Sequence, residues 1–230
     1  MANTEYALSV SDYIFSIAPM LRNSVYASAV RRAREMGKEL YVDNGTYEGQ
    51  LMGTAEYLEL CREWKPDVVV APDVIGDAGK TVAAMQEFFD GLPPVGERAF
   101  KVMVVPQGSS IELKRRVFAY ALDKFHPDIL GLGLGAFDKD WRARALFLRV
   151  VDCPLRRIHI LGIANLADLC FWSAFAESCD TSLPFHAAQD GVGVLDEKKK
   201  STRLDWFDTL EGERLRLDAR NVELVRRVLK

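Results

Sequence analysis

Short apolar runs alternate with longer amphipathic stretches along most of this chain. The runs are rich in Val, Ile and Leu and lack a strict alternation of polar and apolar residues, which is typical of strands buried on both faces of a parallel sheet. Seven of them are predicted to be strands: Tyr13–Ile17, Glu39–Val42, Asp67–Ala71, Phe100–Val105, Asp128–Leu132, Arg157–Leu161 and Cys179–Ser182.

The stretches between these runs carry the 3.6-residue spacing of amphipathic helices, and Asp77 and Ser110 stand where N-caps belong. The predicted helices are Leu21–Met36, Thr54–Trp64, Ala78–Phe89, Ile111–Phe125, Trp141–Val150 and Ala164–Ala176. Repeated strand–helix units indicate an α/β domain. Seven or eight units in about 200 residues favour a compact TIM-type (β/α)8 barrel over the alternative, a doubly wound open sheet.

The last part of the chain has a different pattern. Residues 187–217 are polar and include the run Lys198–Lys200, which predicts an irregular basic excursion. Residues 218–230 then show apolar positions at helical spacing and predict a terminal helix. We therefore expect residues 1–230 to form a single barrel domain with these two additions.

Composition narrows the class of protein. The 230 residues include 33 acidic and 30 basic side chains, so net charge alone does not indicate a nucleic-acid-binding protein. No apolar stretch has the length of a membrane span, and residues 1–11 lack the positive charge of a signal peptide, so we expect a cytoplasmic protein without a membrane partner. Basic residues cluster at four places, which predict solvated helix faces or a phosphate-binding surface: Arg31, Arg32 and Arg34; Lys114–Arg116; Arg142, Arg144 and Arg149; Lys198–Lys200 with Arg203.

The cysteines and histidines do not predict a metal site. The four cysteines form no CxxC pair, and no two of the three histidines have the spacing of metal ligands. We therefore expect reduced thiols, no bound metal and no cofactor.

Polar residues follow the apolar runs at regular intervals. Asp43, Asp73, Gln107 and Asp180 each come at or just after the end of a predicted strand, and glycine-rich turns follow two other strands. The carboxyl ends of parallel strands converge on one face of a barrel, where active sites lie. A single Asp in such a position is also a common cap or turn residue. Several at successive strand ends indicate a site.

Converging carboxylates suit glycosyl transfer. One carboxylate can capture an oxocarbenium-like C1′ centre covalently while a second handles the proton of the leaving group. The sequence contains no serine nucleophile elbow, no P-loop and no HExxH motif, and the glycines at 131, 133 and 135 do not have dinucleotide-binding spacing.

These segments together resemble the tRNA-guanine transglycosylase superfamily, from about residue 39 to residue 186. The segment 41–47 is similar to the family's strand followed by Asp-Ser-Gly-Gly-Phe, and residues 105–108 resemble its Val-Gln-Gly. Residues 66–73, 130–135 and 158–163 resemble its base-recognising strand, its glycine-rich turn and its Tyr-Leu-Met-Gly-Val strand. Ser178 to Pro184 resembles the Ser-Phe-Asp-Cys-Val-Leu-Pro signature around the nucleophile.

The resemblance implies a role for each matching residue. It makes Asp180 the nucleophile that forms a covalent glycosyl-enzyme and Asp43 the general acid and base. The implied substrate-binding residues are Asp73 and Gln107 at the edge of the base, Gly133 and Leu134 through their backbone, Tyr47 and Leu161 on the two faces of the ring, and Asn44 beside them.

One departure from the family pattern bears on the substrate. No cysteine follows Cys179, and His186 is the only later histidine, so the zinc module of the tRNA-acting members is missing from this sequence. The chain looks more like a short branch of the superfamily, found with bacteriophage genes, that places 7-deazaguanines in DNA. The resemblance thus implies exchange of guanine in a polynucleotide, DNA above all, for a free 7-deazaguanine base such as preQ0.

Three alternatives stay open at this stage. The chain could act on tRNA, serve as a non-catalytic binding subunit of such an enzyme, or be a nucleoside hydrolase or transferase that acts on small molecules. The sequence leaves the incoming base, the target context and the oligomeric state open, a homodimer included.

Overall fold

A single parallel sheet organises the computed structural model, which describes residues 13–46, 49, 52–133, 141–151, 153, 157–163 and 166–180. Its seven strands lie side by side in chain order, and every neighbouring pair is parallel. The strands are β1 (Tyr13–Ile17), β2 (Glu39–Asp43), β3 (Val68–Val70), β4 (Lys101–Val104), β5 (Ile129–Gly133), β6 (Ile158–Leu161) and β7 (Ser178–Cys179).

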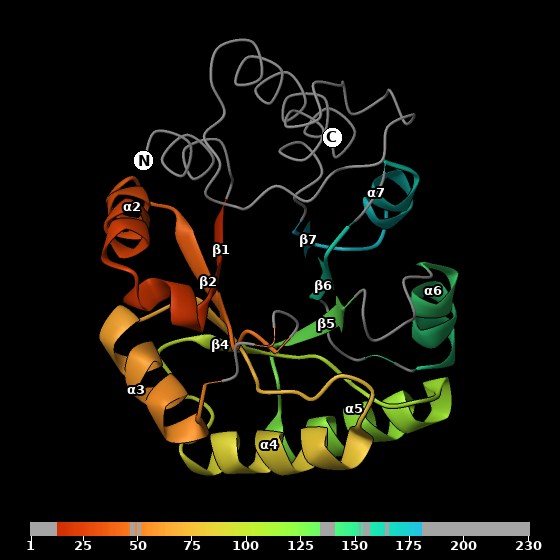
Figure 1. Ribbon diagram of the computed structural model, residues 1–230. Helices are drawn as coiled ribbons and strands as arrows, with labels where there is room; N and C mark the ends of the chain where they lie inside the picture. The colour runs from red at the N-terminus through yellow and green to blue at the C-terminus, as the bar shows by residue number, and fades with distance from the viewer. Residues whose placement is uncertain are drawn as a thin grey trace.

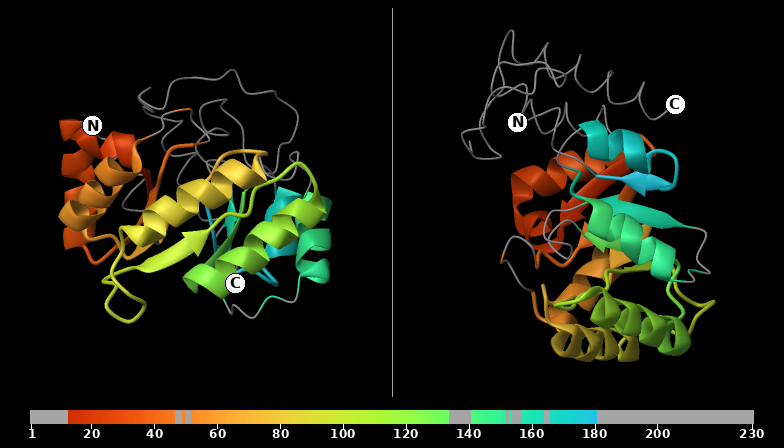
Figure 2. Two further views of the ribbon diagram at one scale, coloured as in Figure 1. Left: turned by 90° about the horizontal axis from the view of Figure 1, so that it is seen from below. Right: turned by 90° about the vertical axis from the view of Figure 1, so that its right-hand side faces the viewer.

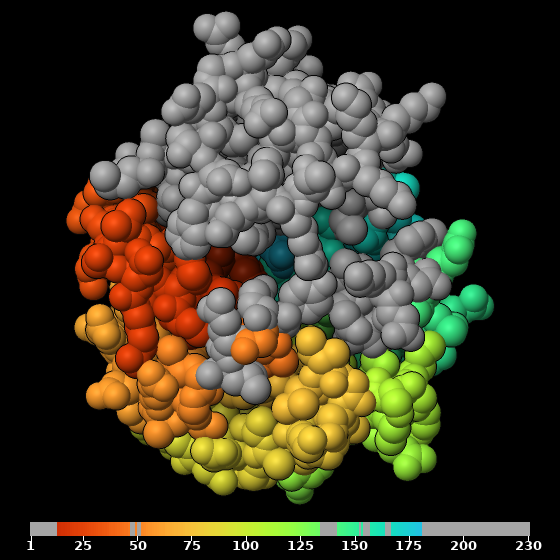
Figure 3. Space-filling model, in the orientation of Figure 1, coloured from red at the N-terminus to blue at the C-terminus, as the bar shows by residue number. Residues whose placement is uncertain are grey.

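Helices connect successive strands and lie on the outer side of the curled sheet (Figures 1 and 2). They are the 3₁₀ helix η1 (Ala18–Arg22), α2 (Ser24–Glu35), α3 (Thr54–Trp64), α4 (Ala78–Asp90), α5 (Ile111–Phe125), α6 (Trp141–Val150) and α7 (Leu166–Trp172). The outer surfaces of α3 and α4 form the lower part of the space-filling view (Figure 3). This arrangement leaves the inner side of the sheet for the strands' own side chains.

The predicted α/β class and most element boundaries are confirmed. Asp77 and Ser110 cap α4 and α5 by accepting from the backbone N–H groups of Lys80 and Leu113. The predicted helix Leu21–Met36 is wrong at its start, because Asn23 ends η1 and caps α2 with its side chain. The predicted segments 187–217 and 218–230, and the last residues of the predicted strand Cys179–Ser182, lie outside the described residues.

Alternate residues of each strand pack into two separate apolar layers. One layer lies between sheet and helices and contains Leu40, Val69, Val102 and Leu130. The other fills the inner side of the sheet with Tyr41, Val68, Val70, Met103, Val105 and Ile129, joined by Tyr13, Phe15 and Leu161. Because side chains of a strand alternate between faces, this pattern also fixes which polar residues face inward.

The sheet curls into part of a barrel and does not close into the expected eight-stranded one. No ladder joins β7 to β1 within the described ranges, yet the curl is tight enough for the Tyr13 hydroxyl to donate to the Cys179 carbonyl at 2.5 Å. The expectation of eight strands came from counting seven or eight strand–helix units in about 200 residues, of which the apolar runs themselves predict seven strands.

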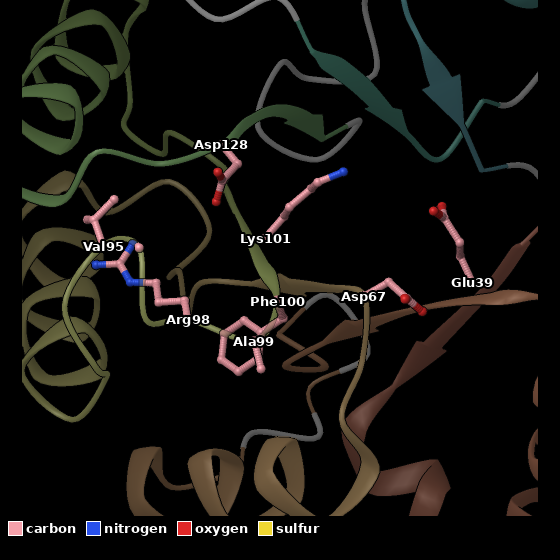
Figure 4. Close-up of a pocket in the computed structure, with 9 residues that line it drawn as sticks. Glu39, Asp67, Val95, Arg98, Ala99, Phe100, Lys101 and Asp128 are labelled. Carbon is pink, nitrogen blue, oxygen red and sulfur yellow. The ribbon is translucent and has the colours of Figure 1, made fainter.

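Acidic residues at the amino ends of the strands accept hydrogen bonds from the backbones of neighbouring strands. The Asp67 carboxylate accepts from Leu40 N and Asp128 accepts from Val102 N, each at 2.8 Å, and Arg34 pairs with Asp67. Asp67 and Asp128 line an open hollow of about 540 Å³, together with Lys101 (Figure 4). Two of its acids, Asp67 and Asp128, are already bonded to strand backbones, and the hollow lies at the opposite end of the strands from the predicted residues, so we do not take it as the candidate site.

Two of the predicted basic clusters contain a buried member. Lys114 is 6% exposed and donates to the Gly108 carbonyl at 2.5 Å, and Arg144 is completely buried. A solvated helix face is therefore the wrong interpretation for these two residues, whereas Arg116 of the same cluster is exposed. Amphipathic helices bury long basic side chains when a backbone carbonyl or an acid lies within reach.

Candidate functional site

The polar residues predicted at the strand ends lie at the carboxyl ends of the parallel strands. Asp43 is the last residue of β2, in register with Ile17 of β1, and Asp180 directly follows β7. Asp73 and Gln107 follow β3 and β4 after short turns. Two hydrogen-bonded groups form at this edge of the sheet, one around Asp73 and one around Asp180.

The first group holds a buried carboxylate between two side-chain amides. Asp73 is 8% exposed; Gln107 Nε2 donates to its Oδ2 at 2.5 Å and Asn44 Nδ2 donates to its Oδ1 at 3.4 Å. Both amides are oriented by backbone N–H groups, since Thr46 N donates to Asn44 Oδ1 at 2.8 Å and Gly76 N donates to Gln107 Oε1 at 3.3 Å. Their NH₂ groups are thereby turned toward Asp73.

Burial and hydrogen bonding act on Asp73 in opposite directions. Burial raises the pKa of the Asp73 carboxyl, while hydrogen bonds from Gln107, Asn44 and Thr46 act to lower it. Burial has the larger effect. The group is therefore a buried carboxylate whose two amide neighbours are themselves held by backbone hydrogen bonds.

A tyrosine from α3 fixes the strands that carry this group. The Tyr57 hydroxyl lies 2.9 Å from both the Val42 and the Val70 carbonyl oxygens, so one side chain bridges β2 and β3. Burial raises the pKa of Tyr57 well above its ordinary value, and the nearby charges of Asp43 and Asp73 act in the same direction. Tyr57 therefore stays a neutral donor and ties the two strand ends together.

The second group holds the Asp180 carboxylate between two donors. Gly162 N donates to Asp180 Oδ2 at 3.0 Å, and His159 Nε2 lies 3.2 Å from Oδ1. Gly162 has φ of 69°, a backbone conformation that side chains disfavour, which accounts for glycine at this turn. The Asp180 side chain is 28% exposed, so its position is fixed while it stays accessible.

His159 reaches Asp180 from inside the curled sheet. Its ring is completely buried, stacks on Phe15 with centroids 5.6 Å apart, and meets Tyr13 edge-on at 6.0 Å. Its Nδ1 lies 2.8 Å from the hydroxyl of Ser178, its register partner on β7. Gly131 is its register partner on β5, and a Cβ there would lie 2.8 Å from both Met103 Sδ and Val105 Cγ2, so the side chains of the inner layer pack closely over this glycine.

Ser178, His159 and Asp180 are the residue types of a serine hydrolase triad, but the positions of the serine and the acid are exchanged. In such triads the serine meets substrate and the acid is buried behind the histidine. Here Ser178 is in β7 and Asp180 directly follows that strand; both side chains contact His159, and Asp180 is nearer to the carboxyl edge. The arrangement presents a carboxylate, not a hydroxyl, at the edge of the sheet.

A buried ion pair lies near Asp180 in the helix layer. Arg144 Nη2 of α6 is 3.8 Å from Asp168 Oδ2 of α7, and the two side chains are 0% and 2% exposed. Burial lowers the pKa of Arg144 against the opposing charges of Asp168 and Asp180, and burial raises the pKa of Asp168. No guanidinium nitrogen of Arg144 has a hydrogen-bond partner among the described residues.

The thiol next to Asp180 is unsuited to act as a nucleophile. Cys179 points into the helix layer, where burial and the charges of Asp180 and Asp168 raise its pKa to about 12. A protonated thiol is a poor nucleophile, so Cys179 is not a candidate for that role.

The remaining predicted residues divide between described and undescribed parts of the chain. Gly133 ends β5 in register with Leu161 at the end of β6, and Leu161 packs against the inner apolar layer. Tyr47 and Leu134 lie outside the described residues, so their predicted roles against the base stay predictions.

Sequence reasoning missed the partners that fix the two carboxylates. His159, Ser178 and Tyr57 received no role, although the two-residue spacing of Ser178 and Asp180 places both on one face of a strand. The contact of His159 with them depends on the register between β6 and β7, which carries no local signal in the sequence.

Comparison with known protein families and with characterised proteins finds no match to this chain. None of the helices in the described ranges is long and apolar enough to cross a membrane. Within the same ranges, no three His, Cys, Asp or Glu residues are grouped so that they could hold a metal ion.

Proposed function

We propose that the protein is a base-exchange transglycosylase that replaces guanine in a polynucleotide with a 7-deazaguanine such as preQ0. The observation that carries the proposal is the Asp180 carboxylate, fixed by Gly162 N and His159 Nε2 yet open to solvent at the carboxyl end of β7. A carboxylate held in this way can attack a sugar C1′ without first reorganising. The resemblance of residues 178–184 to the nucleophile signature supports the same assignment.

The reaction consists of two displacements at C1′. Asp180 forms a bond to C1′ as the bond to guanine breaks, and Asp43 gives a proton to the departing base. The 7-deazaguanine then attacks C1′ as the bond to Asp180 breaks, and Asp43 takes its ring proton. Charge and protons balance over the cycle with the two carboxylates and the two bases alone.

Base selection belongs to the buried group around Asp73. Guanine and 7-deazaguanines share an edge with N–H donors at N1 and N2 and an acceptor at O6. The Asp73 carboxylate suits the two donors, and the amide of Gln107 suits the acceptor once it turns from Asp73. The strength of this selection comes from burial, since a base that leaves these groups unpaired loses binding free energy.

The polymer proposed as substrate is DNA, on the resemblance to the short branch without the zinc module. For duplex DNA the target nucleotide has to leave the base stack before C1′ is reached. Parallel incubation of purified protein with guanine-labelled DNA and tRNA, with added 7-deazaguanines, measures release of labelled guanine. Release from DNA alone is expected. Release from tRNA alone would replace DNA by tRNA, and no release from either would point to the binding-subunit alternative.

Substitution of Asp180 tests the chemistry. Asp180→Asn keeps an acceptor for Gly162 N but removes the nucleophile, so release of labelled guanine should fall by about 10³-fold or more while the protein stays folded. Asp123→Asn, the same change at an exposed position on α5, is the matched control and should leave the rate unchanged. Near-normal exchange by Asp180→Asn would mean that Asp180 only caps the turn after β7.

A further inference from the structure

The structure carries an inference about His159 that deepens the proposed function and rests on it. We infer that His159 is the positioning residue of the nucleophile: its Nε2–H holds Asp180 Oδ1, and Ser178 fixes the tautomer from the other side of the ring. Three observations carry this assignment, namely the hydrogen bonds of the ring, its enclosure, and the geometry of the two neighbouring strands.

The hydrogen bonds of the ring dictate its tautomer. An ionised Asp180 offers only acceptors, so the hydrogen of the 3.2 Å contact belongs to His159 Nε2. In the neutral ring Nδ1 is then an acceptor, and the Ser178 hydroxyl at 2.8 Å is the donor that it requires. With Gly162 N on Oδ2, each carboxylate oxygen of Asp180 receives one donor.

The enclosure of the ring keeps it in place. His159 has no exposed surface and is surrounded by the rings of Phe15, Tyr13 and Tyr41, with centroids 5.6, 6.0 and 5.8 Å from its own. The inner layer thus supplies a rigid wall behind the carboxylate. Because the His159 ring has no contact with solvent, its two nitrogens form their hydrogen bonds with Ser178 and Asp180.

The strand geometry places the ring between its two partners. His159 and Ser178 are register partners on β6 and β7, and Asp180 follows two residues later on the same face. Asp180 N in turn donates to the Ile160 carbonyl at 3.1 Å, which fixes the backbone of the nucleophile to β6. His159 of β6 therefore holds one oxygen of the Asp180 side chain, while Gly162 N, just after β6, holds the other.

The first test detects the hydrogen bond between His159 and Asp180 by NMR, without any activity measurement. Nitrogen-15 NMR of histidine-labelled protein distinguishes His159 from His126 and His186 by comparison with His159→Gln. The neutral ring should carry its hydrogen on Nε2, and Asp180→Asn should shift that resonance, while Asp123→Asn should not. A hydrogen on Nδ1, or a His159 signal that does not respond to Asp180→Asn, would overturn the inference.

The second test separates positioning from folding. His159→Leu removes the donor and should lower kcat by about 10²-fold with KM nearly unchanged, because only the reacting geometry is lost. His159→Gln keeps an amide N–H on a chain of similar reach and should recover at least about tenfold of that loss. Equal kcat for wild-type protein and His159→Leu would overturn the inference.

The two proposals can fail separately. If wild-type protein releases no guanine from any polymer but the NMR pairing is found, the proposed function fails and the His159–Asp180 pair stands. If exchange is found and His159→Leu is fully active, the transglycosylase stands and the positioning role of His159 fails. If His159→Leu does not fold, the NMR measurement on Asp180→Asn and the kcat of His159→Gln still decide the inference, and a His159→Gln kcat as low as that of Asp180→Asn would count against it.

Discussion

Two buried carboxylates in this molecule are held by different means and should respond differently to change. Asp73 accepts from two oriented amides, whereas Asp168 faces a guanidinium that lacks other hydrogen bonds among the described residues. Burial raises the pKa of both carboxyls above the ordinary value of an aspartate. Each therefore gives a prediction at the scale of a single residue.

The first prediction concerns the pH dependence of stability at Asp73. A raised pKa in the folded protein means that the native state keeps a proton that the unfolded chain has already lost. The retained proton contributes its whole stabilisation below pH 3.8, the pKa of the unfolded chain. This contribution is lost as the pH rises through the pKa of the folded protein. The total loss is about 1.4 kcal/mol for each unit by which the two pKa values differ. Asp73→Asn removes this loss, so its free energy of unfolding should improve relative to wild type as the pH rises.

Urea unfolding of both proteins from pH 4 to pH 7 measures that difference. Every other titrating group is shared by the two proteins, so its contribution cancels. A difference that stays constant over this range, or that moves in favour of wild type, would contradict the assignment.

The second prediction is an asymmetry within the buried pair of Arg144 and Asp168. Arg144→Met leaves an acid that can take up a proton, because burial already raises its pKa. Asp168→Asn leaves a guanidinium that stays charged in the apolar layer, and should cost about 3–5 kcal/mol. Chemical denaturation should therefore rank Asp168→Asn well below Arg144→Met, and the reverse order would refute this account.

At the scale of an element, β5 shows how closely its neighbours approach on the inner side of the sheet. A Cβ on Gly131 would lie within 3.0 Å of side-chain atoms from Met103 and Val105, in and just after β4, and from Leu161 of β6. Among the described residues, a Cβ on Gly133 of the same strand would meet only Val105, at 3.5 Å, an ordinary contact distance. The two glycines form a matched pair.

Gly131→Ala should therefore destabilise the protein by about 1–3 kcal/mol, because the inner layer has to shift to admit a methyl group. Gly133→Ala should change stability by less than about 1 kcal/mol. The thermal unfolding midpoint of each variant checks the pair. A larger decrease of the unfolding midpoint for Gly133→Ala than for Gly131→Ala would contradict the prediction, because it would mean that the inner layer accommodates a methyl group at Gly131 without loss of stability.

The elements were predictable from sequence because their signals are local. The apolar runs and the caps at Asp77 and Ser110 act within a few residues, and the boundaries from β2 to α6 agree with the structure to within two residues. The predicted helix Ala164–Ala176 is wrong at its end, because α7 ends at Trp172. The break at Asn23 was missed because the helical apolar spacing continues across it. The role of His159 was missed because it arises from pairing between strands that are separate in the chain.

At the scale of the whole molecule, the curl of the sheet brings its first and last strands within reach of each other. Tyr13 of β1 donates to the backbone of β7, and its ring stacks on Tyr41 at 4.5 Å. The inner layer is therefore built from both ends of the sheet, although no ladder closes it within the described ranges. The carboxyl-edge residues could be listed from sequence, but their division into two groups depends on this curvature.

The whole-molecule prediction concerns metal content. Cys61 is buried in the helix layer with its pKa raised to about 12, and Cys179 likewise, so neither presents a ready thiolate ligand. Metal analysis of chelator-washed protein should find far less than one zinc per chain, with guanine release unchanged by the treatment. Stoichiometric zinc would reopen the tRNA alternative.

The order of the strands has a consequence for synthesis on the ribosome. Since each strand after β1 pairs with the one before it, the segment from β2 to the turn after β4, which carries Asn44, Asp73 and Gln107, is complete before β6 and β7 emerge. The half proposed to select the base can then take shape while the half proposed to react with the sugar is still being translated. A nascent chain arrested after α5 would hold a recognition surface without a nucleophile, and reactivity would arrive with the last strand.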